Sequence, residues 1–164
     1  MKKLHLIRHA KSSWSDGSLA DKDRPLNKRG LKSCRIMAPE IVKVGCGFDH
    51  VFCSPAVRAQ LTIEHICQSL TEREIKWQLD DALYTFHSRV LWEWCCGLDN
   101  PMSEVVIIGH NPAMTDFCNE VSNCNIENIP TCGYVQLGFA RSSWQDLSSG
   151  SCELLSFLKP KMFI

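Results

Sequence analysis

Short apolar runs alternate along this chain with longer segments in which apolar residues recur every three or four positions. The short runs predict buried strands, and the three-to-four spacing predicts helices with one apolar face. Polar stretches with glycine, proline or serine separate these segments and are typical of loops. We expect strands within residues 4–10, 49–53, 75–79, 104–108, 134–139 and 152–158, and helices from Asn27 to Gly45 or Gly47 and over about 55–70, 86–98 and 112–121.

This order of elements predicts an α/β fold. Alternating strands and helices favour a parallel sheet with helices on both faces, a three-layer α/β/α sandwich. The last two strands are joined by a serine-rich loop at 141–151, so we expect a hairpin that leaves a C-terminal strand antiparallel in a mostly parallel sheet. Without repeats or linkers, residues 1–164 are predicted to form a single domain.

The first helix contains two local signals. Asn27 is a favourable N-cap because its side-chain oxygen can accept a hydrogen bond from the first helical turn. Pro39 falls among the helical positions, where a proline costs about 3 kcal/mol unless the helix kinks or stops. We therefore expect a bend near Arg35.

Three of the apolar runs end in residues that can carry positive charge. The first runs into Arg8 and His9, the second is followed by Arg58, and the fourth leads into His110. Ligands of open α/β sheets bind at the carboxyl ends of the strands, where helices begin. If these three strands are neighbours, the four side chains face one crevice, which would suit an anion.

Composition narrows the possible partners. The chain has 18 acidic and 18 basic residues and a net charge of zero, so general binding to nucleic acid or to an acidic membrane has no electrostatic support. No apolar run approaches the length of a membrane span or a signal peptide, and we expect a cytoplasmic protein. The ten cysteines lack zinc or thioredoxin spacing and are expected to be reduced, mostly buried thiols.

Rival motifs fit less well. His5 and His9 have the spacing of a helical zinc pair, but on a strand four residues span ~13 Å, too far to share a metal. Cys53 and Arg58 are similar to a cysteine-phosphatase loop with one intervening residue too few. A phosphate-binding G-x-x-x-x-G-K loop and a G-x-S-x-G nucleophile motif are both absent. Each histidine or arginine could still be purely structural.

Three motifs resemble those of the histidine phosphatase (phosphoglycerate mutase-like) superfamily. They are Leu-Ile-Arg-His-Ala at 6–10, Ser-Pro-Ala-Val-Arg-Ala at 54–59 and Gly-His-Asn-Pro at 109–112. Further segments are similar to those of SixA-type phosphohistidine phosphatases, and the resemblance extends over essentially the whole chain. These segments are 8–14, 23–26, 29–30, 130–131 and 158–161.

The resemblance implies a metal-independent phosphatase without cofactors. His9 would attack phosphorus and become transiently phosphorylated, while Arg8, Arg58 and His110 would bind the phosphoryl oxygens. Relatives use an acid near the third strand, and Asp81 falls about there, although it is equally well explained as a solvated turn residue. The expected partner is a phosphohistidine-bearing protein domain or a small phosphoester, with no nucleic acid and no membrane.

Some positions depart from the family pattern. Ala10 replaces the signature glycine, Ser15 stands where many relatives have a phosphate-binding asparagine, and Leu61 occupies the place of a glutamine. Two other functions therefore stay open. One is a phosphatase or mutase for small phosphorylated molecules, and the other is a catalytically silent module that binds phosphorylated ligands.

Overall fold

A six-stranded mixed sheet forms the centre of the molecule in a computed structural model that describes residues 1–164. The strand order is β3-β2-β4-β1-β5-β6, and β5 is antiparallel to both of its neighbours while the other pairings are parallel. The predicted fold class is thereby confirmed. The strands are β1 (Lys2–Arg8), β2 (His50–Cys53), β3 (Trp77–Leu79), β4 (Glu104–Gly109), β5 (Tyr134–Phe139) and β6 (Cys152–Leu158).

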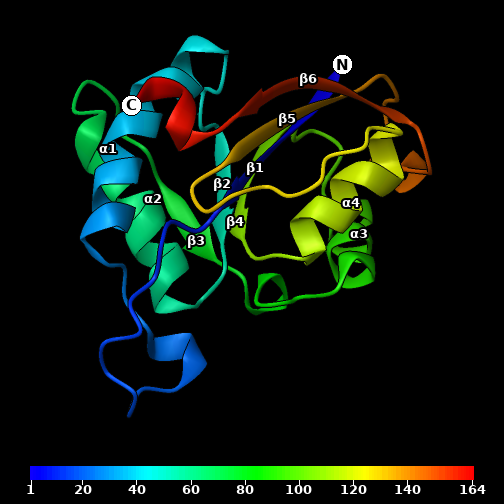
Figure 1. Ribbon diagram of the computed structural model, residues 1–164. Coiled ribbons are helices and arrows are strands. Elements are labelled where there is room, and N and C mark those ends of the chain that lie inside the picture. The colour runs from blue at the N-terminus through cyan, green and yellow to red at the C-terminus, as the bar shows by residue number, and fades with distance from the viewer.

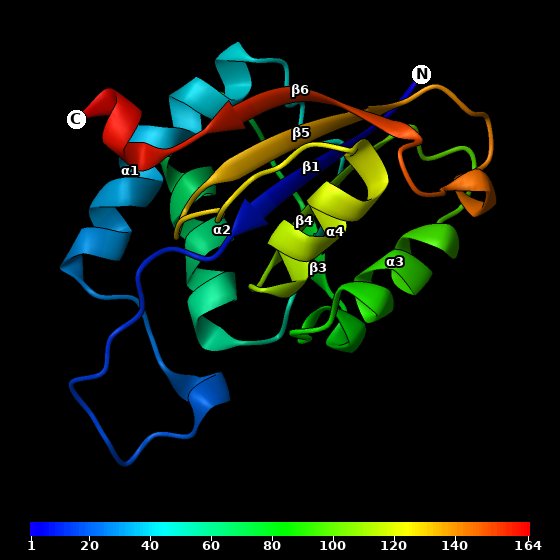
Figure 2. The same cartoon turned by 45° about the vertical axis from the view of Figure 1, so that its right-hand side comes forward.

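Helices cover both faces of this sheet (Figures 1 and 2). On one face, α1 and α2 pack together over a core that includes Met37 and Ile63. On the other face, α3 and α4 enclose a second core around Phe117 and Trp144. None of the helices has the length and apolar character needed to span a bilayer. The four helices are α1 (Lys28–Lys43), α2 (Val57–Ser69), α3 (Ser88–Cys96) and α4 (Ala113–Ser122).

The first helix begins as predicted and does not break at its proline. The Asn27 side chain accepts a hydrogen bond from the Gly30 amide at 2.9 Å, which is the expected N-cap. Helix α1 then continues through Pro39 to Lys43. Arg35, whose carbonyl loses its donor to the proline ring, is exposed, so water can satisfy that carbonyl.

A polar loop between β1 and α1 folds back over the carboxyl ends of the strands. Ser12 forms an isolated bridge with Leu26, and a short 3-10 turn, η1 (Asp21–Asp23), lies between them. Gly30 sits directly against this loop, because a Cβ there would lie 2.3 Å from the Lys11 carbonyl oxygen. A glycine at position 30 therefore lets this loop pack directly against the start of α1.

Candidate active site

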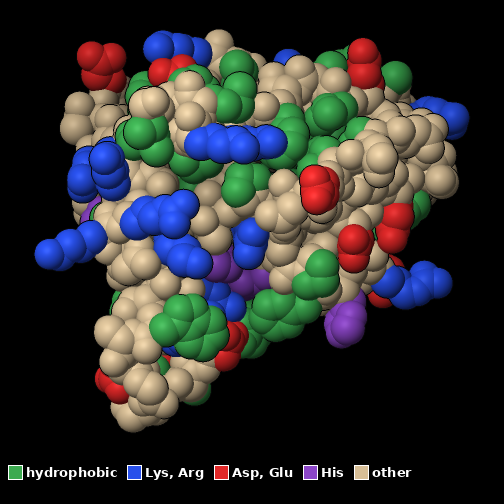
Figure 3. Space-filling view, in the orientation of Figure 1, with side chains coloured by type: hydrophobic (Ala, Val, Ile, Leu, Met, Phe, Trp, Pro, Cys, Tyr) green, Lys and Arg blue, Asp and Glu red, His purple; other side chains and the backbone are tan.

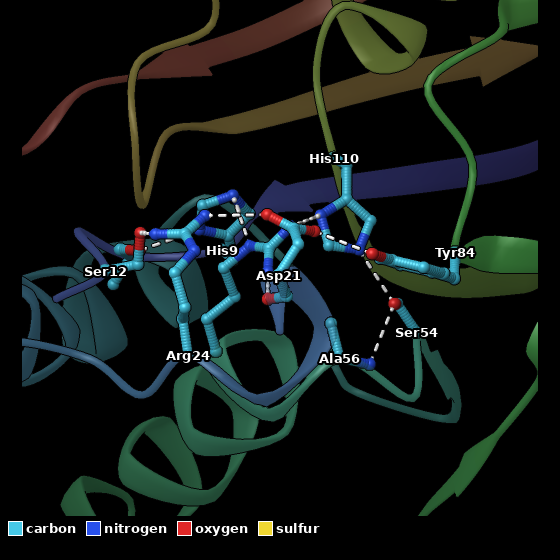
Figure 4. A network of polar contacts seen from close by, with 10 residues as sticks. His9, Ser12, Asp21, Arg24, Ser54, Ala56, Tyr84 and His110 are labelled. Atoms are coloured by element: carbon cyan, nitrogen blue, oxygen red, sulfur yellow. Dashed lines mark hydrogen bonds and ion pairs between the residues drawn. The ribbon is translucent and has the colours of Figure 1, made fainter. Parts of the chain in front are cut away.

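The pairing of β1, β2 and β4 brings the three polar strand ends together. Arg8 is the partner of Gly109 in the β1–β4 register, and Cys53 is the partner of Ile108 in the β2–β4 register. The residues that follow these strands therefore meet at one edge of the sheet, where the ring centroids of His9 and His110 lie 5.3 Å apart (Figure 4). The predicted neighbourhood of the two histidines is present in the structure.

His9 has a defined orientation in this site. It is 8% exposed, and its Nδ1 lies 2.8 Å from the Ala10 carbonyl oxygen. Because a carbonyl only accepts, Nδ1 carries the proton and Nε2 carries the free lone pair. Arg58 Nε lies 3.4 Å from that Nε2. The nitrogen able to attack phosphorus thus points at the principal cation of the site.

His110 is held by two contacts. Its Nε2 lies 2.8 Å from Ser54 Oγ, which also accepts a hydrogen bond from the Ala56 amide, and its Nδ1 lies 3.5 Å from Arg58 Nη2. The ring is 2% exposed. The Ser54 contact orients the ring so that its other nitrogen faces Arg58, where an oxyanion would bind.

Both imidazoles are held neutral. Burial, followed by the charges of Arg58 and Arg8, lowers the pKa of His9 from 6.5 to about 4. Burial, followed by the neighbouring His9 and Arg58, lowers the pKa of His110 to about 3. A neutral imidazole is the form that a nucleophilic histidine needs.

We expect NMR of ring-labelled protein to show His9 and His110 as neutral rings down to about pH 5, because their folded-state pKa values lie near 4 and 3. The unfolded chain takes up these protons near pH 6.5, so the folded state loses stability as the pH falls from about 6.5 toward 4 for His9 and toward 3 for His110. Titration of His9 near pH 6.5 would contradict this picture.

Two arginines supply the positive charge. Arg58, in the first turn of α2, is 2% exposed and donates from Nη1 to the Asp21 carbonyl oxygen at 2.7 Å. Arg8 donates from Nη1 to the Ile129 carbonyl oxygen at 2.9 Å, while its buried Nε has no partner. Burial and the charge of Arg58 lower the pKa of Arg8. The two arginines therefore retain N–H groups, such as Arg8 Nε, that can donate hydrogen bonds to a bound anion.

Asp21 is a site residue that sequence reasoning missed. Its Oδ2 accepts hydrogen bonds from Arg58 Nη2 at 3.0 Å and Tyr84 OH at 2.6 Å, and its Oδ1 accepts one from Arg24 Nη2 at 3.0 Å (Figure 4). The hydrogen bond from Tyr84, then those from Arg24 and Arg58, hold the pKa of this carboxyl well below its usual range. Sequence patterns place Asp21 only in a polar loop, because no periodicity marks a single turn, and the family resemblance begins two residues later, at Asp23.

The Asp21 carboxylate also competes with any anion for Arg58. We expect Asp21→Asn to raise the affinity for inorganic tungstate by about threefold or more, because one negative charge leaves the pocket while both arginines stay. Competitive inhibition by tungstate would measure this, with Asp23→Asn in the same turn as the matched control. A lower affinity in Asp21→Asn would instead mean that Asp21 chiefly orients Arg58.

The structure shows no hydrogen bond or ion pair that links the predicted acid, Asp81, to His9, Arg58 or His110. Asp81 is exposed in the 3-10 turn η2 (Asp81–Leu83). From the same segment it is Tyr84 that reaches the site, with its ring centroid 5.4 Å from that of His110. Asp81 as the acid therefore stays a prediction without a supporting contact.

The rival site chemistries have no support in the geometry. Burial raises the pKa of the Cys53 thiol to about 12, which keeps it from forming a nucleophilic thiolate. The His5 ring is hydrogen-bonded to Tyr134 and Glu104 and not to His9. No group of three or more histidine, cysteine, aspartate or glutamate side chains has the arrangement of a metal site.

Known proteins share both the motifs and the fold. An uncharacterised protein of Mycobacterium tuberculosis is 27% identical over 165 residues, which cover 94% of this chain and 100% of that protein. A structure of the protein histidine phosphatase SixA complexed with tungstate superposes with a TM-score of 0.81 at 18% identity, covering 99% of each chain. A variant phosphoserine phosphatase of Entamoeba histolytica in complex with phosphoserine gives a TM-score of 0.67 at 16% identity, covering 100% of each chain.

The sequence profile of the histidine phosphatase superfamily (branch 1) matches residues 4–90, which is more than half of the chain. The matched part contains His9 and both arginines of the pocket, and the similar structures extend the likeness over β4 to β6. The chain belongs to the histidine phosphatase superfamily, branch 1.

Proposed function

We propose that this protein is a phosphatase that forms a covalent phosphohistidine on His9, and that its substrate is phosphohistidine in another protein. One observation carries the proposal: His9 Nε2 holds a free lone pair and faces Arg58, while Nδ1 is occupied by the Ala10 carbonyl. Nucleophile and phosphate-binding cation are thus placed for attack on a bound phosphoryl group.

The reaction would take two steps. In the first, the Nε2 lone pair of His9 attacks phosphorus, a P–N bond to His9 forms, and the P–N bond of the substrate breaks with its electron pair staying on the leaving imidazole, which departs neutral because its ring already carried a proton. In the second, water attacks phosphorus, the P–N bond to His9 breaks, and inorganic phosphate is released. Arg8, Arg58 and His110 would hold the phosphoryl oxygens in both steps, without metal or cofactor.

The acid–base character of the site favours phosphohistidine over an alkyl phosphate ester. An alkoxide leaving group needs a strong proton donor, whereas a protonated imidazole leaves readily. The carboxyl within the pocket, Asp21, has a pKa far too low to donate a proton near neutral pH, and the Asp81 side chain forms no hydrogen bond or ion pair with His9, Arg58 or His110. A substrate that depends little on an enzymatic acid fits this pocket best.

The second candidate is a phosphatase for small phosphomonoesters. The likeness to a phosphoserine phosphatase bound to phosphoserine favours it, because the same fold accepts a small phosphorylated molecule there. The presence of all four residues His9, Arg8, Arg58 and His110 argues against a module that binds phosphorylated ligands without turnover.

Turnover of a phosphohistidine-bearing protein domain, compared with p-nitrophenyl phosphate and phosphoserine, tests the proposal. We expect kcat/KM for the domain to exceed that for either ester by at least about tenfold. A higher value for an ester would support the small-molecule phosphatase. Binding of the phosphorylated domain without release of phosphate would support the silent module.

A further inference from the structure

A cavity of about 470 Å³ lies beside the 128–131 loop, whose Ile129 carbonyl accepts a hydrogen bond from Arg8. It is enclosed by α1, by this loop and by the C-terminal turn η4 (Pro160–Phe163). Four basic residues line it, two from α1 and two from the C-terminal segment. They are Arg29, Lys32, Lys159 and Lys161.

Positive charge predominates in this cavity. No aspartate or glutamate side chain lines it, although the terminal residue Ile164 does, and none of the four basic side chains takes part in an ion pair. The whole chain has equal numbers of acidic and basic residues, so the positive charge here is a local concentration. Figure 3 shows Lys and Arg side chains gathered over this part of the surface, above the recess in which a histidine is visible.

The cavity shares a wall with the active site. The Ile129 carbonyl oxygen accepts hydrogen bonds from Arg8 Nη1 and from Asn111 Nδ2, both at 2.9 Å. Asn111 also donates to Asn128 Oδ1 at 3.1 Å, and Asn128 and Pro130 line the cavity. A chain that places one residue at His9 can therefore place neighbouring residues over the cavity.

We propose that this cavity binds an acidic segment of the protein substrate, next to its phosphorylated residue. The inference rests on the proposed function, since it names the part of that substrate that would be recognised. Lysines on separate segments suit several carboxylates spread along a peptide better than one phosphate, which convergent arginines bind best. Ile36, Pro130 and Pro160 add apolar surface, and the lack of an aromatic side chain gives nucleic-acid bases nothing to stack on.

Binding of a short labelled peptide of alternating glutamate and aspartate, with the active site saturated by inorganic tungstate, tests this surface directly. We expect the double substitution Lys32→Glu/Lys161→Glu to weaken binding of this peptide by about tenfold or more. The matched control, Lys76→Glu/Arg141→Glu, makes the same charge change at exposed positions outside the cavity and should leave the affinity nearly unchanged.

Kinetics separate this inference from the proposed function. The Lys32→Glu/Lys161→Glu variant should have a higher KM for a phosphohistidine-bearing acidic domain, while its kcat for p-nitrophenyl phosphate stays as in the unmodified protein. An unchanged peptide affinity, an equal loss in the control, or tighter binding of a single-stranded oligonucleotide than of the peptide would overturn the acidic-segment site. If only small esters are hydrolysed, the proposed function fails, and the peptide measurement still decides the surface.

Discussion

His9→Ala should lower kcat/KM by at least about 10⁴-fold, because it removes the ring that would carry the phosphoryl group, and with it the covalent step. The remaining cations would still bind phosphate, so tungstate affinity should fall far less than turnover. The fold should survive, since the only backbone group that the ring bonds is the adjacent Ala10 carbonyl and its other contacts are with the site residues Arg58 and His110.

Radiolabelled substrate gives the direct measurement. In the unmodified protein, brief turnover followed by alkaline denaturation should leave a label that is stable to alkali and lost in acid, as phosphohistidine is. His9→Ala should leave none, whereas His50→Ala, at the opposite end of β2 from the site, should keep both label and turnover. Full labelling of the His9→Ala protein would show that another residue is the nucleophile.

Arg58→Lys should lower kcat/KM by about 10³-fold although it keeps the charge. The guanidinium reaches His9 from Nε, the Asp21 carbonyl from Nη1, and His110 and the Asp21 carboxylate from Nη2, and a lysine ammonium cannot occupy those positions together. Bidentate binding of the phosphoryl oxygens, and the stabilisation of charge during transfer, would be lost.

A thermal unfolding curve must accompany this variant, because Arg58 is almost completely buried. Arg89→Lys, on the exposed face of α3, is the matched control and should match the unmodified protein in both melting temperature and rate. An Arg58→Lys protein that stays folded and keeps more than a tenth of its activity would show that Arg8 and His110 suffice.

Element positions followed closely from the chain itself. The last two strands were predicted with the observed bounds, and Asn27 caps α1 as expected. Helix starts were less accurate: α2 begins at Val57, two residues after the predicted start, and Ser54 Oγ accepts a hydrogen bond from the Ala56 amide in the bend that precedes the helix. The spacing of hydrophobic residues and the capping residues are local signals. Side-chain contacts such as this one override those signals at the ends of helices.

The sequence by itself determined the layered fold and the four residues His9, Arg8, Arg58 and His110, because burial repeats with the period of each element and parallel strands end at one edge. Only the tertiary structure decided the rest of the pocket. It placed Asp21 on Arg58, set the proton of His9 on Nδ1 and gathered four basic residues beside the site. These features depend on which loops and chain ends meet in space, and no regular spacing along the chain encodes contacts between irregular segments.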